Sequence, residues 1–242
     1  CKSITDYYSQ GIFSKPNALK AEKFFKLMKE AKIDFEIGNL EVKFNGMSKK
    51  CKANFEVTDE FLKFLGYYIS EGSLNKSRRN YRIELYNKNE KVLQDMTDCI
   101  IKLIGNTPSS RITDRGWGEA TEISFNHKVI YEFIKRYCKT KLEKRIPDFI
   151  YGLDKNKIGA FLSALYTGDG TLDDSNIVYY TSSRNLANDV AQILLVYGIV
   201  ATVAKRNREG RKTTDYEIAF YANYKREEFL KYVKPIEKTS KL

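Results

Sequence analysis

Two apolar, helix-length stretches of this sequence each end in one acidic residue followed by glycine. The first, FLKFLGYYISEGSL, covers residues 61–74, and the second, GAFLSALYTGDGTL, covers residues 159–172. A helix that is apolar on all sides must be buried, and its own copy is the most economical partner here. The pattern predicts two packed helices that present Glu71 and Asp169 at one end. The structural alternative is that both dipeptides merely end two helices with a turn.

Landmarks downstream of the two acids recur at nearly constant spacing, which indicates an internal duplication. The acids are 98 positions apart, and the glycines that end the next helices, Gly105 and Gly198, are 93 apart. We predict an α+β chain of two αββαββα halves, residues 57–150 and 151–242, related by a pseudo-twofold axis. The strands assigned from alternation are 81–86, 110–113 and 121–126 in the first half and 177–181, 200–205 and 216–221 in the second.

Residues 1–50 lie outside the repeat and are predicted to form a small appendage. A helix is expected from Pro16 to about Lys32, followed by a β-hairpin of residues 33–37 and 40–44. The polar residues 45–52 are interpreted as a linker. The appendage is either an additional DNA-contacting module or a packing element beside the first half.

The charge balance favours a polyanionic partner. The 242 residues include 42 Lys+Arg and 31 Asp+Glu, a formal net charge of +11, which favours nucleic acid over a membrane surface. The alternative is a basic protein without such a partner. No membrane-length apolar run or signal peptide is present, so an intracellular location is expected.

The histidine and cysteine content limits the types of catalytic and metal site that the chain can form. With His127 as the single histidine, a Ser-His-Asp triad and a multi-histidine metal site are nearly excluded. The four cysteines show none of the short zinc-ligand spacings. Cys99 and Cys138 lie in apolar helical patterns and are expected to be reduced core thiols.

Two carboxylates at one end of a helix pair call for a counter-charge. Close like charges repel unless a divalent cation lies between them. Few hard oxygen ligands with open positions suit Mg²⁺, and paired ions there can activate water and stabilise the leaving oxygen of a phosphodiester. The small residues where the helices could approach closely are Gly66, Ser70, Ala160, Ala164 and Gly168.

Three motifs resemble those of the LAGLIDADG homing endonucleases of the dodecapeptide type. They are LGYYISEG at 65–72, LSALYTGDG at 162–170 and the basic block KLEKRIP at 141–147. Their amino-acid sequences most resemble those of the endonuclease domain of archaeal inteins. The resemblance covers residues 57–242. It implies a monomer with two saddle-shaped sheets. It also implies a location in the cytoplasm of a prokaryote, in particular an archaeon, or in an organelle. Such a monomer makes Mg²⁺-dependent double-strand cuts in a long asymmetric DNA target and leaves short 3′ overhangs.

The motif match also implies the metal ligands. Glu71 and Asp169 correspond to the family's metal-binding acids and would share two or more Mg²⁺ ions, with the backbone carbonyls of Ser70 and Gly170 as further ligands. The first motif departs from the family pattern because it carries Glu in place of Asp. This change retains a ligand but moves it by one methylene.

The basic residues near the scissile phosphate are inferred from the same match. Lys144 corresponds to the residue that stabilises charge or polarises water. Lys238 is nominated as its counterpart in the second half, with Lys234 as the rival. Because Cys1 opens no recognisable splicing block and no His-Asn pair closes the chain, self-splicing is not predicted.

The strands are expected to contact DNA with one face. If Ile83, Leu85, Ile123 and Phe125 face the core, the alternate positions face the groove. For residues 206–212, contact with DNA and an exposed hairpin tip are equally consistent with the sequence. The expected DNA-contacting residues are Arg82, Glu84, Tyr86, Arg111, Arg115, Glu122, Ser124, Asn126, Tyr180, Lys205, Arg206, Arg208, Arg211, Lys212, Glu217 and Tyr221.

Two other functions remain open within this resemblance. An RNA maturase uses the same fold to bind intron RNA, and a LAGLIDADG-like transcription regulator binds DNA without cleaving it. Retention of Glu71, Asp169 and Lys144 weighs against the regulator. It does not separate an endonuclease from a maturase.

Overall fold

The chain consists of two compact units, Cys1–Glu56 and Val57–Leu242, in a computed structural model. The structure describes residues 21–32, 41–42, 51–52, 56–78, 80–114, 118–206 and 213–236.

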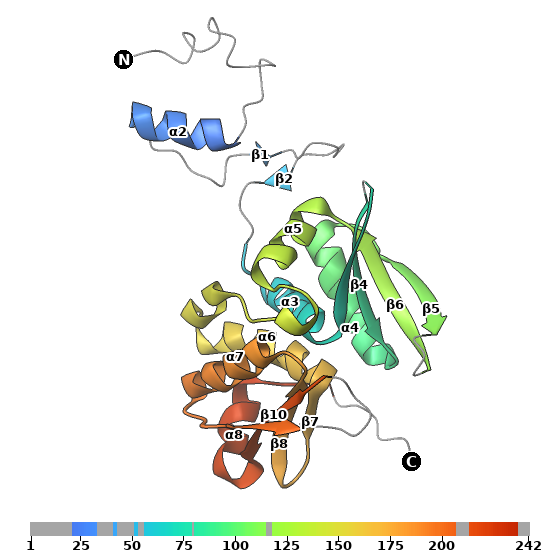
Figure 1. Cartoon of the computed structure of the whole chain (residues 1–242), viewed down its shortest axis with the longest axis vertical. Helices are drawn as coiled ribbons and strands as arrows, with labels where there is room; N and C mark the ends of the chain where they lie inside the picture. Colours follow the sequence, from blue (N-terminus) through green and yellow to red (C-terminus); the bar gives the residue numbers. More distant parts are fainter. Residues whose placement is uncertain are drawn as a thin grey trace, which may run out of the picture. The chain divides into compact units, whose positions relative to one another are not determined.

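The first unit contains one described helix and one short strand pair (Figure 1). Helix α2 (Ala21–Ala31) lies within the predicted helical range. Strand β1 (Glu41–Val42) pairs antiparallel with β2 (Cys51–Lys52). Cys51 and Lys52 were assigned to a linker, and that assignment was wrong because their backbones pair with the strand ten positions earlier. The expected strand 33–37 lies outside the described residues.

The second unit contains the predicted duplication. Its first half forms one antiparallel sheet in the order β3-β4-β6-β5, with helices on one side. The elements of this half are α3 (Asp59–Glu71), β3 (Gly72–Ser77), β4 (Asn80–Asn87), α4 (Glu90–Ile104), β5 (Ser109–Asp114), β6 (Glu119–Asn126) and α5 (Lys128–Tyr137).

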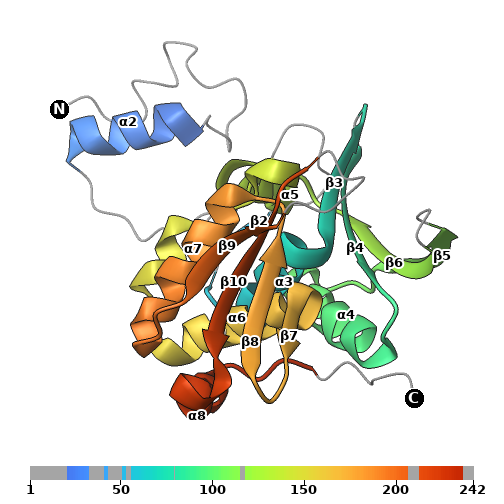
Figure 2. The same cartoon turned by 60° about the horizontal axis from the view of Figure 1, so that its bottom comes forward.

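The second half repeats this order, which confirms the predicted α+β fold of two αββαββα halves. Its antiparallel sheet runs β7-β8-β10-β9, and α7 and α8 pack on it (Figure 2). Short 3-10 helices lie at 141–143, 148–152 and 195–197. The elements of this half are α6 (Lys155–Asp169), β7 (Gly170–Leu172), β8 (Asn176–Thr181), α7 (Arg184–Leu194), β9 (Thr202–Arg206), β10 (Asp215–Tyr221) and α8 (Ala222–Tyr232).

Local sequence signals explain where the two central helices begin. Thr58 Oγ1 accepts a hydrogen bond from the Phe61 amide at 3.2 Å and so caps α3. Asp154 Oδ1 accepts the amides of Asn156 and Lys157 at 2.9 and 3.1 Å and caps α6 in the same way. The next helix of each half stops at a left-handed glycine, with φ of 71° at Gly105 and 70° at Gly198.

The core lies around the central helix pair and on the inner faces of the two sheets. Figure 1 shows α3 and α6 side by side between the sheets, and they make the largest contact between any two described elements. Cys99 and Cys138 are buried free thiols in this core, which confirms their predicted role. Among the described residues, no helix has the length and apolar character needed to cross a membrane.

Candidate active site at the end of the central helices

The two central helices touch at the small residues that the sequence singled out. A Cβ atom at Gly66 would lie 2.5 Å from the carbonyl oxygen of Phe161 and 2.9 Å from Cβ of Ala164. Four residues further along each helix, a Cβ atom at Gly168 would overlap the side chain of Ser70. Both contacts advance in the same direction along the chain, so α3 and α6 run parallel and their C-terminal ends meet.

The parallel crossing brings the two acids together. Glu71 is the last residue of α3 and Asp169 the last residue of α6. Cγ of Glu71 lies 3.1 Å from the position of a Cβ on Gly168, the residue before Asp169. Asn87 Nδ2 donates to Glu71 Oε1 at 3.3 Å and helps to orient this carboxylate.

Both helices leave the crossing in the same manner. Gly72 has φ and ψ of −99° and 156°, and Gly170 has −91° and 157°, so each begins a strand directly after its acid. A Cβ atom at Gly72 would lie 2.6 Å from the Tyr68 carbonyl oxygen, and one at Gly170 would lie 2.5 Å from that of Tyr166. The glycines therefore permit a turn so tight that the next strand starts against the last helical turn.

Lys144 joins the two acids at this end. Its Nζ donates to the carbonyl oxygens of Tyr68 at 3.1 Å and Gly72 at 2.9 Å. Burial lowers the pKa of Lys144 to about 8, and the nearby charges of Asp169 and Glu71 oppose this shift. The structure thus brings together three of the four residues predicted to be catalytic.

The second half of the chain holds the backbone around Lys144. Ser183 Oγ donates to the Lys144 carbonyl oxygen at 2.7 Å and also caps α7. Asp189 Oδ2 accepts the Ile146 amide at 2.8 Å from a buried position. Sequence reasoning missed both contacts. Ser183 carried a helix-capping signal, whereas nothing in the local sequence linked Asp189 to position 146.

A cavity of about 570 Å³ opens beside Asp169. It lies between the end of α3, the segment that carries Lys144 and the end of β8. Its lining includes three lysines, Lys135, Lys141 and Lys144, and two carboxylates, Asp169 and Asp215. Hydroxyl groups of residues 181–183 complete the wall. The three lysines of this lining suit an anionic group held next to Asp169.

The second half has no described equivalent of Lys144. Lys234 is exposed, and its backbone amide donates to Ser163 Oγ at 2.7 Å. Lys238 lies outside the described residues. On this side, the buried hydroxyls of Tyr166 and Tyr179 have no hydrogen-bond partner among the described residues. Burial raises the pKa of Tyr179, and the charge of Asp169 adds to that effect.

The donor set at the crossing fits a hard divalent cation. Glu71 and Asp169 supply carboxylate oxygens, and the carbonyls of Ser70 and Gly170 flank them in sequence. No group of three or more His, Cys, Asp and Glu side chains suited to a metal occurs within the described ranges. Such a site suits Mg²⁺, which retains several waters and takes oxygen ligands from phosphate. The roles of the two carbonyls stay a prediction.

The prediction of which strand residues of the first sheet face the core is correct. Ile83, Leu85, Ile123 and Phe125 are all buried. On the opposite face, however, most of the expected DNA-contacting side chains are covered by one another. Glu84, Tyr86, Glu122 and Ser124 are buried, Arg82 is half-buried, and Arg111 and Asn126 are exposed.

The second sheet is more open on the corresponding face. Tyr180 and Glu217 are half-buried, and Lys205, Arg206 and Tyr221 are exposed. Contact of these residues with DNA stays a prediction. The remaining expected DNA-contacting residues, Arg115, Arg208, Arg211 and Lys212, lie outside the described residues.

Sequence comparisons identify relatives of this chain in archaeal replication and transcription proteins. The chain is 31% identical over 180 residues, 71% of its length, to a DNA polymerase of Thermococcus sp. (strain GE8), of which it covers 10%. It is 28% identical over 167 residues to the replication factor C small subunit of Methanocaldococcus jannaschii, covering 67% of this chain and 9% of that protein. It is also 25% identical over 169 residues to the RNA polymerase subunit Rpo1C of the same organism, covering 69% and 19%. The chain thus spans about a tenth of the first relatives it matches.

A family model and two solved structures classify the fold. The model of the LAGLIDADG-like domain matches residues 156–234. The homing endonuclease I-DmoI in complex with DNA and Mn matches with a TM-score of 0.58 at 17% identity, covering 76% of this chain and all of that one. The homing endonuclease I-WcaI bound to its DNA recognition sequence matches with a TM-score of 0.54 at 13% identity, covering 78% and 90%. Residues 156–234 therefore form a LAGLIDADG-like domain, and the chain has the fold of the LAGLIDADG homing endonucleases.

Proposed function

We propose that this chain is a site-specific homing endonuclease that hydrolyses one phosphodiester bond in each strand of a long, asymmetric DNA duplex. The observation that carries this proposal is the convergence of Glu71, Asp169 and Lys144 at one end of the helix pair. A binding protein has no need for two carboxylates that face a polyanion, because they repel it. A single monomer with two similar halves suits cuts in both strands, and we expect short 3′ overhangs.

The residues at the helix ends have different roles in the proposed hydrolysis. Lys144 is an ammonium with three N–H donors, two of which are held by the carbonyls of Tyr68 and Gly72. The third can donate to a phosphate oxygen and stabilise the charge that develops during hydrolysis. Asn87 keeps Glu71 oriented beside Asp169.

We infer that Mg²⁺ is the cofactor, with two or more ions shared by Glu71 and Asp169. Divalent cations held there would lower the pKa of water and stabilise the leaving oxygen. I-DmoI, which shares this fold, has been studied in complexes with DNA and Mn and with DNA and Ca. This supports the use of a divalent cation at the corresponding place.

The sequence relatives support an origin as an inserted nuclease. A DNA polymerase, an RNA polymerase subunit and a replication factor have different activities, yet each matches this chain over a small part of its length. An activity that belongs to any one of them cannot explain the shared segment. A mobile segment of the intein type explains it directly, and we infer that this chain corresponds to the endonuclease of such an insert.

Cleavage of selected DNA tests the proposal. Duplexes that the wild type binds are selected from a random library and incubated with Mg²⁺ or with a chelator. We expect cuts in both strands only with Mg²⁺. Glu71→Gln and Asp169→Asn should abolish cutting and leave binding largely intact, whereas Asp174→Asn, at an exposed carboxylate nearby in sequence, should leave both unchanged.

Two results would contradict the proposal in different ways. A wild type that binds selected DNA tightly and never cuts it would be a regulator. Unchanged cleavage in Glu71→Gln or Asp169→Asn would mean that the hydrolytic site lies elsewhere.

A further inference from the structure

The polar face of the first sheet carries a cluster of two buried carboxylates and two arginines that are more exposed, here called the arginine–glutamate cluster. It consists of Arg82, Glu84, Arg111 and Glu122 on the three adjacent strands β4, β6 and β5. Arg82 forms ion pairs with Glu84 and Glu122, and Arg111 forms one with Glu122. The four residues carry two positive and two negative charges, so the cluster is formally neutral.

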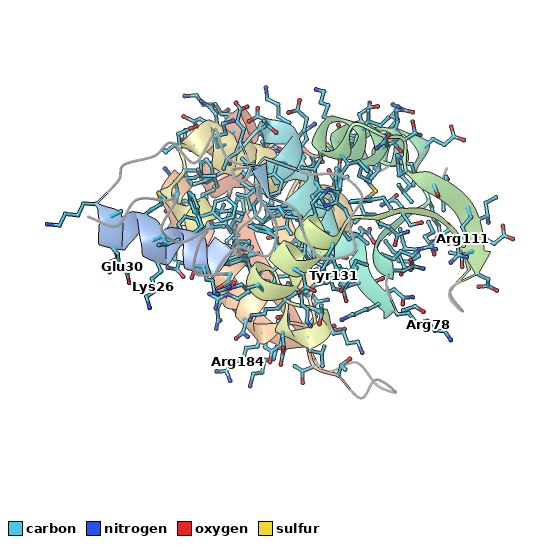
Figure 3. The ribbon with its side chains drawn as sticks, turned by 90° about the horizontal axis from the view of Figure 1, so that it is seen from above. Lys26, Glu30, Arg78, Arg111, Tyr131 and Arg184 are labelled. Carbon is cyan, nitrogen blue, oxygen red and sulfur yellow. The ribbon has the colours of Figure 1, made fainter. Side chains whose placement is uncertain are left out.

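Arg111 is held in one orientation by Glu122. The two residues face each other across β5 and β6 in the strand register. Arg111 Nε donates to Glu122 Oε1 at 3.1 Å, and Nη2 donates to Oε2 at 2.9 Å. Such a bidentate pair fixes the plane of the guanidinium group. Figure 3 shows Arg111 on its strand at the outer part of the molecule.

The two partners differ in exposure, which determines which one can meet a ligand. The Glu122 side chain is 2% exposed and the Arg111 side chain is 61% exposed. Burial would raise the pKa of Glu122, but hydrogen bonds from Arg111 and Arg82 outweigh it and hold that pKa below its usual range. Glu122 therefore stays ionised beneath the arginine and cannot itself reach a partner on this face.

A neutral cluster is poorly suited to phosphate attraction and well suited to hydrogen-bond recognition. Non-specific affinity for DNA grows with the number of phosphate charges that free Lys and Arg neutralise. Here each arginine is already paired with a carboxylate, so little net charge is available for that purpose. The guanidinium N–H groups that point away from Glu122 remain available as hydrogen-bond donors. They form the outer edge of the planar group, and the pairing with Glu122 holds this edge in a fixed orientation.

We propose that Arg111, oriented by Glu122, recognises a guanine in the major groove of the target half-site that the first sheet contacts. The inference rests on the proposed DNA-cleaving function. The outer edge of a guanidinium matches O6 and N7 of guanine, which is the commonest specific contact between proteins and DNA. Glu84 and Glu122 position the arginines and do not contact the DNA.

The second sheet lacks this arrangement at the equivalent place. In its register the residue opposite Glu217 is Ala204, where the first sheet has Arg111 opposite Glu122. Glu217 pairs instead with Arg206, whose guanidinium lies 5.8 Å from the ring centre of Tyr180. Ala204 cannot make the contact proposed for Arg111, so this contact is expected at that register position of the first sheet and not at its equivalent in the second.

Base-by-base binding profiles test the proposal. The selected target is varied at every position to all four base pairs, and affinities are measured for the wild type, Arg111→Lys, Arg111→Ala and Glu122→Gln. We expect the wild type to prefer G·C at one position by roughly 5- to 150-fold and both Arg111 variants to lose that preference. Glu122→Gln should weaken preference at the same position and leave the others unchanged. Lys102→Ala, which removes an exposed cation of α4 that pairs with Glu60 of α3, should keep the whole profile.

The outcomes separate this inference from the proposed function. Uniform loss of affinity at all positions in Arg111→Ala would show that Arg111 contacts phosphate, and would overturn the inference while site-specific binding stands. A wild type without any sequence preference would overturn both. Arg111→Lys changes an exposed side chain, so its profile remains informative even if Glu122→Gln fails to fold.

Discussion

Gly168 lies so close to Ser70 that a Cβ atom at position 168 would overlap the Ser70 side chain and lie 3.1 Å from Cγ of Glu71. The separation of the two acids is therefore set by the absence of a side chain at one helical position. The helix contact and the candidate metal site are the same feature viewed from two sides. A change in the packing of α3 against α6 must move Glu71 relative to Asp169.

Gly168→Ala should lower both stability and cleavage. The added methyl group forces the helices apart, and overpacking of this kind costs about 1–3 kcal/mol of unfolding free energy, partly offset by the better helix propensity of alanine. Urea denaturation and the single-turnover cleavage rate measure the two effects. Gly152→Ala is the matched control because a Cβ there has no neighbour within 4 Å. An equal effect in both variants would mean that close helix approach is not what matters.

The cleavage rate should fall as pH rises through the pKa of Lys144. In the proposed mechanism the residue acts as an ammonium donor, and its pKa is lowered to about 8 chiefly by burial. It is therefore protonated and active below that pH and loses its proton above it, with a midpoint at or above pH 8 because bound phosphate favours the charged form. Lys144→Arg should remove this alkaline decline, since a guanidinium stays protonated.

The pH experiment requires that DNA binding is measured at each pH, so that weaker binding is not mistaken for slower hydrolysis. A rate that increases through pH 8 would show that Lys144 works as a neutral amine. In that case it would act as a base toward water.

Asp189→Ala should destabilise the second unit and displace Lys144. The substitution leaves the buried Ile146 amide without its acceptor, which costs about 1–3 kcal/mol. Asp189→Asn keeps an acceptor oxygen at the same place and should lose less. Equal losses in the two variants would instead implicate the charge of Asp189 toward Arg145, whose Nε lies 3.9 Å away.

Much of the fold could be predicted because its signals are local. Thr58 and Gly105 mark a helix start and a helix stop through hydrogen bonds that span three or four residues. Strands β3 and β7 could not be assigned from the sequence, because β3 (GSLNKS) is mostly polar and β7 (GTL) is too short to show alternation. The pairing of β1 with β2 was missed because two-residue strands carry no alternation.

The site was predicted in part for the same reason. The repeat of acid and glycine indicated Glu71 and Asp169, and spacing from a basic block indicated Lys144. The hydrogen bonds of Ser183 and Asp189 to the backbone of that block join residues about 40 positions apart. No periodic pattern in the sequence reveals contacts of this kind. Burial of Glu84 and Glu122 was also beyond reach, because alternation assigns a face but not what covers it.

The sequence by itself determined that there are two halves and that an acid ends each central helix, and its net charge favoured a polyanionic partner. Repetition, helix capping and net charge are properties of the chain read in order. Only the tertiary structure decided how closely the acids approach, that Lys144 is half-buried with a lowered pKa, and that Glu122 holds the exposed Arg111 from a buried position. These depend on distances between segments remote in sequence, and packing sets those distances.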